Sequence, residues 1–258
     1  MATLIMAKYL PDTNVLIDFG RSLTIRTKLE RARENGIAFV VAPPSLIELV
    51  RGMVAQSGRF FENDKKVFVW LKGSTVLELP RPFMARILRT TTQQRSGVEP
   101  QHYNMLIEMI ADSADYGDFI RKCETPNGIW RESARADEVH EAELDKEFRA
   151  LHEISKRGVS SKDVATKLSQ SFGAPGCRPN PLIVWRVFSA AHEFLGASIS
   201  KISAGAKPRK NDSGLYTDFQ LLLYSADPEI TFLTREDFSN EIKNSPQKSR
   251  IVGPDSLP

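Results

Sequence analysis

The residues best suited to do chemistry are carboxylic acids placed where a predicted strand gives way to a predicted helix. In a parallel sheet these transitions meet at the carboxyl edge of the strands, where α/β proteins place their sites. Carboxylates gathered at one edge repel one another, so a cluster of them needs a cation. Four transitions carry such acids, at Asp12, at Glu48, at Asp218 and at the neighbours Glu236 and Asp237.

The type of ligand predicts the cation. Oxygen ligands without a nearby His or Cys favour Mg²⁺ or Mn²⁺ over zinc. A divalent ion held by carboxylates lowers the pKa of bound water and stabilises charge on a scissile phosphate. The expected catalytic residues are Asp12, Glu48, Asp218 and Asp237; the expected metal ligands are these four and Glu236, which competes with Asp237 as the fourth acid.

Each acid also has a purely structural explanation. Asp12 could form a turn after a strand, since Asp and Asn favour such turns. Glu48 and Asp218 could complement a helix dipole. Either of the two acids after the last long strand could cap the helix that follows.

Further polar side chains are expected to support the site. Asn14 is placed to orient Asp12 or a water molecule, and Thr234 to supply a hydroxyl, although both could be plain capping or turn residues. A basic loop precedes Asp218, and its cations could reach a phosphate backbone near the acids. The residues expected to bind nucleic acid are Lys207, Arg209 and Lys210.

The elements that would position these residues alternate between strands and helices. Buried-strand patterns lie at Ala7–Leu10, Ile37–Ala42, Thr75–Leu79 and Ile230–Leu233. Such alternation favours β-α-β units and a parallel sheet, which makes an α/β fold the expected class.

Two helices next to the acids are predicted from local signals. Ser45 is the expected N-cap of a helix over Leu46–Gln56, which carries Glu48. Glu236–Ile242 has the pattern of a short amphipathic helix.

The middle of the chain has a different character, because no strand signal appears from about residue 84 to residue 210. We therefore predict an α/β domain formed by residues 1–92 and 211–258, with an all-helical insertion over residues 93–210. The predicted helices of the insertion are Tyr103–Ile120, Asp137–Arg157, Ser161–Phe172 and Pro181–Ile202.

The order of these motifs resembles that of PIN-domain ribonucleases. The four matching elements are the run from Asp12 to Asp18, the segment Ser45 to Glu48, Asp218 with Ala226, and Leu233-Thr234-Arg235-Glu236-Asp237. The resemblance implies a three-layer α/β/α sandwich that hydrolyses RNA with Mg²⁺ or Mn²⁺ held by the acids. It also implies a toxin of a toxin–antitoxin pair or an RNA-processing nuclease, with RNA as substrate and an antitoxin protein or a second copy of the chain as candidate partners.

The sequence departs from the family pattern in two places. The separation between Glu48 and Asp218 is far wider than compact PIN domains need. The family's Thr-x-Asp spacing falls on Glu236, whereas the residue type fits Asp237.

Composition narrows the class of protein. The chain has 258 residues, of which 41% are hydrophobic and 26% charged, so low-complexity and wholly disordered classes are excluded. The net charge of +3 permits a nucleic-acid partner without requiring one. Two cysteines cannot form a disulfide framework, and neither a signal peptide nor an uninterrupted apolar span is visible. We expect a cytoplasmic protein without a membrane partner.

Two other functions remain open at this point. A PIN-like fold without catalysis could bind RNA or a protein. An aspartyl-phosphate phosphatase of the haloacid-dehalogenase type also begins with Asp after a strand, but its Asp-x-Asp pattern is broken here by Asn14.

Overall fold

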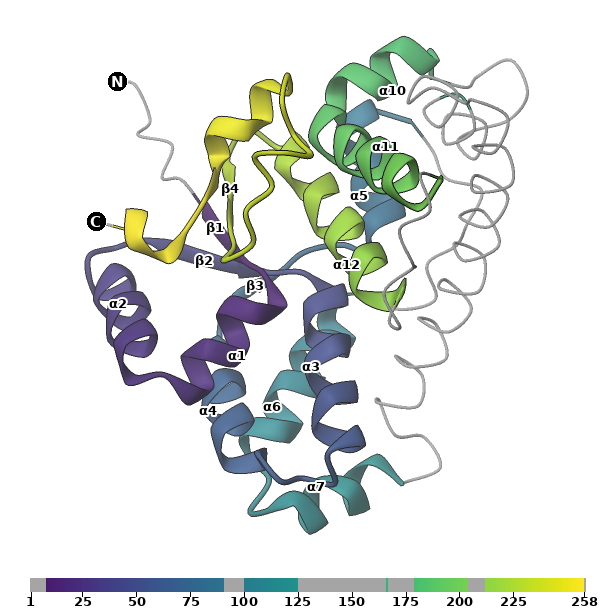
Figure 1. Cartoon of the computed structure of the whole chain (residues 1–258). Helices are drawn as coiled ribbons and strands as arrows, with labels where there is room; N and C mark the ends of the chain where they lie inside the picture. Colours follow the sequence, from purple (N-terminus) through teal and green to yellow (C-terminus); the bar gives the residue numbers. More distant parts are fainter. Residues whose placement is uncertain (1–7, 91–99, 125–165, 167–178, 204–211, 258) are drawn as a thin grey trace.

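A parallel β-sheet occupies the centre of the computed structural model, which describes residues 8–90, 100–124, 166, 179–203 and 212–257 (Figure 1). The strand order is β3-β2-β1-β4-β5, and every neighbouring pair is parallel. The central strand pairs Tyr9 with Phe39 on one side and with Thr231 on the other. The strands are β1 (Lys8–Pro11), β2 (Ala38–Val41), β3 (Thr75–Val76), β4 (Ile230–Leu233) and β5 (Ile251–Val252). The predicted parallel α/β sheet is therefore confirmed.

Helices cover both faces of this sheet and form two hydrophobic cores with it. The first core is built with α1 (Thr13–Arg21), α2 (Leu23–Glu34), α3 (Pro43–Ala55), α4 (Phe61–Leu71), α6 (Pro100–Ala111) and α7 (Tyr116–Cys123). The second is built with α5 (Pro80–Leu88), α10 (Pro181–Val187), α11 (Ser189–Ser203) and α12 (Asp212–Leu223). The 3₁₀ helices are η1 (Tyr224–Ala226), η2 (Pro246–Arg250) and η3 (Pro254–Ser256).

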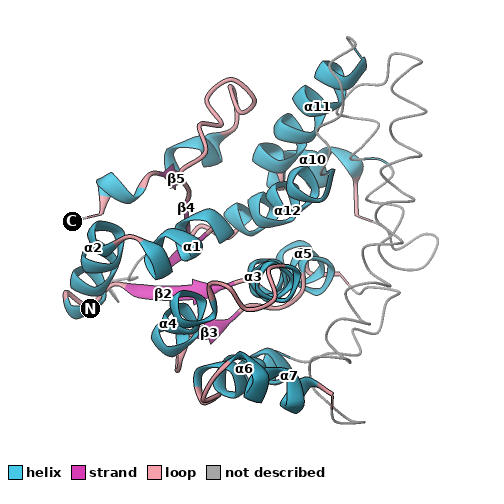
Figure 2. Cartoon of the chain, turned by 60° about the horizontal axis from the view of Figure 1, so that its bottom comes forward, coloured by secondary structure: helices cyan, strands magenta, loops and turns pink. Residues whose placement is uncertain are grey.

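The alternation of side chains along each strand assigns them to the two cores. Phe39 and Val41 belong to the first core, and Val40 between them belongs to the second. In β4, Leu233 likewise joins the first core and Phe232 the second. Figure 2 shows the resulting separation, with α10, α11 and α12 together on one side and α6 and α7 far from them on the other. Helix layers on both faces of a sheet make the arrangement of an α/β/α sandwich.

The described parts of the predicted insertion contain helices and no strand. Buried residues of α6 and α7 share the first core with α4, and those of α10 and α11 share the second core with α12. The predicted helices Asp137–Arg157 and Ser161–Phe172 lie outside the described residues, except for the helical Thr166. The division into residues 1–92 with 211–258 and residues 93–210 stays a prediction.

One expected helix, Tyr103–Ile120, is two helices in the structure. The second of them, α7, starts after its N-cap Asp115, whose carboxylate accepts the backbone N–H of Asp118 at 2.8 Å. The Asp118 carboxylate in turn accepts the backbone N–H of Ala114 at 2.9 Å. This reciprocal capping gives the backbone an alternative to a continuous helix.

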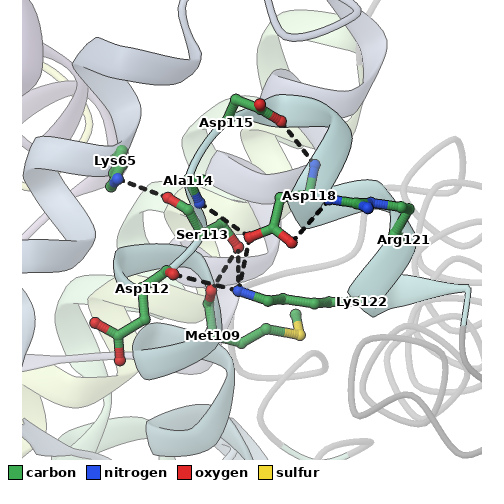
Figure 3. A network of polar contacts seen from close by, with 9 residues as sticks. All are labelled: Lys65, Met109, Asp112, Ser113, Ala114, Asp115, Asp118, Arg121 and Lys122. Carbon is green, nitrogen blue, oxygen red and sulfur yellow. Dashed lines mark hydrogen bonds and ion pairs between the residues drawn. The ribbon is translucent and has the colours of Figure 1, made fainter.

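Two lysines hold the same turn in place (Figure 3). Lys65 of α4 donates to the backbone carbonyl of Ser113 at 2.6 Å. Lys122 of α7 donates to the carbonyl of Asp112 at 3.2 Å and to the Ser113 hydroxyl at 3.3 Å. The break between α6 and α7 is therefore set by polar contacts from α4 and from α7 with its N-cap, which hydrophobic periodicity does not report.

Three other local predictions were wrong. The helix with Glu48 begins at Pro43 and not at Leu46, because Pro43 and Pro44 fit its first turn and Ala42 takes the N-cap position expected for Ser45. The segment Pro181–Ile202 is divided at Phe188, since α10 ends there and α11 begins at Ser189.

The third wrong prediction is the helix expected over Glu236–Ile242, where the chain forms turns. The Thr234 hydroxyl accepts the Glu236 N–H at 3.0 Å, and the Asp237 carboxylate accepts the Ser239 N–H at 2.9 Å. Such local side-chain bonds compete with helix formation.

Substitution of two helical glycines by alanine is expected to change stability in opposite directions. A Cβ at Gly20 of α1 would lie 2.6 Å from the backbone oxygen of Asn63, so Gly20→Ala should lower the free energy of unfolding by about 1–3 kcal/mol through overpacking. A Cβ at Gly52 of α3 would have no neighbour within 4 Å. Gly52→Ala should therefore raise the free energy of unfolding by up to about 1 kcal/mol, because alanine favours the helix more than glycine does. Urea denaturation measures both changes, and equal changes would contradict the close packing of α1 on α4.

Candidate functional site

Asp12 lies at the point where the strand order of the sheet reverses. The chain runs from β1 through β2 to β3 on one side and then returns to β4 on the other side of β1. The backbone N–H of Asp12 donates to the carbonyl of Leu233, the last residue of β4, at 2.9 Å. The carboxyl ends of strands at such a switch point are where open α/β sheets bind their ligands.

The Asp12 side chain is buried, with 3% of the residue exposed, and both of its oxygens accept hydrogen bonds. Oδ1 accepts the backbone N–H of Val15 at 2.7 Å, which makes Asp12 the N-cap of α1. Oδ2 accepts the Thr234 hydroxyl at 2.5 Å. Asp12 therefore caps α1, where a turn residue was the structural alternative, and Thr234 supplies its expected hydroxyl to Asp12.

Glu48 reaches the same region through Thr13, the residue after Asp12. The Thr13 hydroxyl donates to Oε2 of Glu48 at 2.6 Å, and this joins the start of α1 to the second turn of α3. No role in the site was expected for Thr13. The sequence feature that could have indicated this role is a hydroxyl residue directly beside the candidate aspartate.

Of the two acids that follow β4, the structure brings Glu236 to the site. Asn14 donates from Nδ2 to Oε1 of Glu236 at 3.2 Å, so the expected supporting residue Asn14 contacts an acid. Asp237 instead accepts hydrogen bonds from Ser239, which hold the pKa of Asp237 below its ordinary value. As placed, Glu236 lies with the buried aspartate and Asp237 lies in the turn beyond it.

The electrostatics of Asp12 reflect this arrangement. The pKa of Asp12 is raised from 3.8 to about 6, and burial is the largest cause. The hydrogen bonds from Thr234 and Val15 lower this pKa, whereas the negative charges of Glu236 and Glu48 contribute smaller increases. A buried carboxyl whose charged form is disfavoured by two neighbouring carboxylates would be stabilised by a cation.

Asp218 lies within α12 and not at its start, because that helix begins at Asp212. The residue is half-buried. Its helix packs against α3, the helix that carries Glu48. The basic residues expected nearby, Lys207, Arg209 and Lys210, lie outside the described residues.

Arg235, to which sequence reasoning gave no role, stands between Thr234 and Glu236 in the chain. Its guanidinium forms an ion pair with Asp18 on α1. That pair, followed by the charges of Asp255 and Asp12, raises the pKa of Arg235. A permanent cation therefore lies close enough to the carboxylates of Asp18 and Asp12 to feel both charges.

The donor set has the chemistry of a hard cation site, although its side chains do not converge as placed. Asp12, Glu48 and Glu236 offer only oxygen, which suits Mg²⁺ or Mn²⁺. Each of the three accepts a hydrogen bond from an uncharged side chain. Within residues 8–90, 100–124, 179–203 and 212–257, no group of three or more His, Cys, Asp or Glu side chains is arranged to hold a metal ion.

Comparisons with protein-family models, with curated proteins and with solved structures found no match. In the described part of the chain, no helix is long and apolar enough to cross a membrane.

Proposed function

We propose that this protein is a divalent-metal-dependent endoribonuclease with a PIN-like α/β/α fold. One observation carries the proposal: an aspartate at the switch point of a parallel sheet has its pKa raised by burial and, to a smaller extent, by the charges of Glu236 and Glu48. The order of the sequence motifs, which resembles that of PIN-domain ribonucleases, supports RNA as the substrate.

The residues proposed to hold Mg²⁺ or Mn²⁺ are Asp12, Glu48 and Glu236, with Asp218 as a further candidate on the helix beside α3. When bound, the ion would supply charge stabilisation at the scissile phosphate and acidify water. Thr234 and Thr13 orient two of the carboxylates by donating hydrogen bonds, and Asn14 orients the third. Arg235 adds a positive charge on the side from which a phosphate would approach.

The proposal is tested by incubating the purified protein with single-stranded RNAs in Mg²⁺, in Mn²⁺ and in EDTA. We expect cleavage with either metal and none in EDTA. A folded protein that cleaves none of several RNAs in any of these conditions would contradict the proposal.

A matched pair of substitutions distinguishes the two acids after β4. We expect Glu236→Gln to lower the cleavage rate by about 100-fold, because it removes a charge next to Asp12. We expect Asp237→Asn to change the rate less than about threefold, because its carboxylate faces Ser239. Single-turnover kinetics at saturating Mn²⁺ measure both, and the reverse order would assign the fourth acid to Asp237.

The basic segment before α12 carries a separate prediction. Reversal of Lys207, Arg209 and Lys210 to Glu should weaken RNA binding and flatten its dependence on salt, because fewer counterions are released from the RNA. RNA binding measured across a range of NaCl concentrations tests this, and unchanged binding would exclude these residues from the interface.

A second candidate function is a PIN-like module that binds RNA or a protein without catalysis. It is favoured by one observation, that the described acidic side chains are not arranged as a group that could hold a metal ion. It predicts RNA binding without cleavage in any metal and no loss of binding in Asp12→Asn. The antitoxin and the second copy of the chain stay predictions, to be tested by co-purification and by light scattering.

A further inference from the structure

A cleft of about 490 Å³ opens at the carboxyl ends of β4 and β5. Its lining begins with Thr234, Arg235 and Glu236, so the cleft is continuous with the residues around Asp12. The rest of the lining comes from the turn after β4, from η2, from β5 and from the start of η3. Binding sites for small molecules are usually about 300–1,000 Å³, so this cleft is large enough for one nucleotide.

Two cations line the cleft, and each faces carboxylates at the protein surface. Arg235 pairs with Asp18, but the side chains of this pair are 55% and 27% exposed. An ion pair so exposed is weak in water because the solvent screens it. A phosphate group can therefore replace the Asp18 carboxylate on the guanidinium, which binds phosphate through parallel hydrogen bonds. Lys248 is exposed on η2 and offers a second positive charge.

Each carboxylate in the lining already accepts a hydrogen bond or pairs with a cation. Asp237 accepts the Ser239 N–H, and Asp255 pairs with Lys28 outside the cleft. Glu236 accepts the amide of Asn14. Asp237 is also attracted by Lys248, and Asp255 by Arg235. The lining therefore holds three carboxylates and two cations, and a phosphate would bind by replacing these carboxylates on the guanidinium and ammonium groups.

Apolar side chains form another part of the lining. Ile251 of β5 is half-buried and belongs with Phe238 and Ile242 to the second core, so these three side chains form one face of the lining. Val252 points to the opposite face of the sheet and packs against the first core. A flat aromatic group of the size of a nucleobase can bury this surface. A cleft with cations and an apolar surface matches an anion joined to a base.

We propose that this cleft is a nucleotide subsite, in which Arg235 and Lys248 bind the phosphate and the apolar face of Ile251 and Phe238 binds the base. The inference rests on the proposed function, because the subsite is continuous with the acids and would hold the nucleotide next to the scissile phosphate.

The first test measures binding without cleavage, in EDTA. Nucleoside 5′-monophosphates, the corresponding nucleosides and inorganic phosphate are titrated separately while backbone amide signals of residues 234–239 and 251–255 are followed by NMR. We expect the monophosphates to shift these signals and to bind about tenfold more tightly than either half of the molecule. Equal binding of inorganic phosphate, or no shift in these residues, would overturn the subsite.

Charge-removing variants locate the phosphate. Arg235→Gln and Lys248→Gln should each weaken monophosphate binding about tenfold, and each should lower the salt slope of RNA binding by about 0.7. Lys243→Gln is the matched control, because it removes an exposed charge from the same segment outside the cleft lining. Equal effects of all three variants would overturn the assignment.

Different results would contradict the proposed nuclease activity and the proposed nucleotide subsite. Metal-dependent cleavage with KM unchanged in Arg235→Gln and Lys248→Gln would overturn the subsite and leave the nuclease standing. Nucleotide binding that depends on these two residues, without cleavage of any RNA, would support the subsite and overturn the nuclease.

Discussion

Asp12→Asn is expected to lower metal-dependent RNA cleavage by on the order of 1,000-fold, equivalent to about 4 kcal/mol of transition-state stabilisation. The substitution removes the charge at the centre of the acidic cluster while nearly preserving the shape of the side chain. An asparagine oxygen can still accept the Val15 N–H, because Asn is as good an N-cap as Asp. The measurement is the single-turnover rate on single-stranded RNA with Mn²⁺, with circular dichroism to verify folding.

Asp115→Asn is the matched control for this substitution. Asp115 caps α7 as Asp12 caps α1, by accepting the N–H three residues later, but it lies in the turn between α6 and α7. Cleavage by Asp115→Asn should equal that of the unmodified protein. Cleavage that survives in Asp12→Asn would indicate a contaminating nuclease or a different catalytic centre.

Asp12→Asn is also expected to stabilise the protein at neutral pH. The pKa of Asp12 is about 6 in the folded state and ordinarily 3.8, so the folded state favours the protonated form. The stability that this carboxyl contributes is therefore fully present below about pH 4 and is lost as the pH rises through 6. The shift corresponds to about 3 kcal/mol of unfolding free energy, which the unmodified protein loses as the pH rises and Asp12 ionises. Asp12→Asn keeps this free energy because asparagine does not ionise.

A second buried group has the opposite effect in the same pH range. Burial lowers the pKa of His192 from 6.5 to about 4, so its contribution to stability is lost as the pH falls from about 6.5 to 4. The two contributions offset each other in the unmodified protein. The pH dependence of stability in that protein alone would therefore not reveal Asp12.

The informative quantity is the difference between the two proteins at each pH. Urea denaturation in EDTA at pH 4, 5, 6, 7 and 8 should give a stability difference, variant minus unmodified protein, that rises by about 3 kcal/mol between pH 4 and 7. The contribution of His192 cancels in this difference. A difference independent of pH would mean that Asp12 titrates near its ordinary pKa, without the influence of burial and of Glu48 and Glu236.

Addition of Mn²⁺ should raise the melting temperature of the unmodified protein more than that of Asp12→Asn, because a ligand that binds only the folded state stabilises it.

Local sequence patterns predicted the alternating architecture of this protein. Strand patterns at Ile37–Ala42 and Ile230–Leu233 correspond to β2 and β4, because short runs of β-branched and aromatic residues specify a strand buried on both faces. The position of Asp12 followed from the same signals, since an acid directly after the first strand of a parallel sheet must lie at its carboxyl edge. The PIN-like identity and the metal stay predictions.

The tertiary structure decided which side chains meet. Glu236 lies near Asp12 and Asp237 does not, because Thr234 and Ser239 form local turns where periodicity predicted a helix. The link from Thr13 to Glu48 joins two helices that are separated by a strand and a helix, and no local pattern encodes it. Hydrophobic spacing reports which face of an element is buried, whereas the direction of a polar side chain depends on hydrogen bonds to residues distant in sequence. For this reason the sequence determined the edge of the sheet at which the acids gather, and only the packing of α1, α3 and the turn after β4 decided their partners.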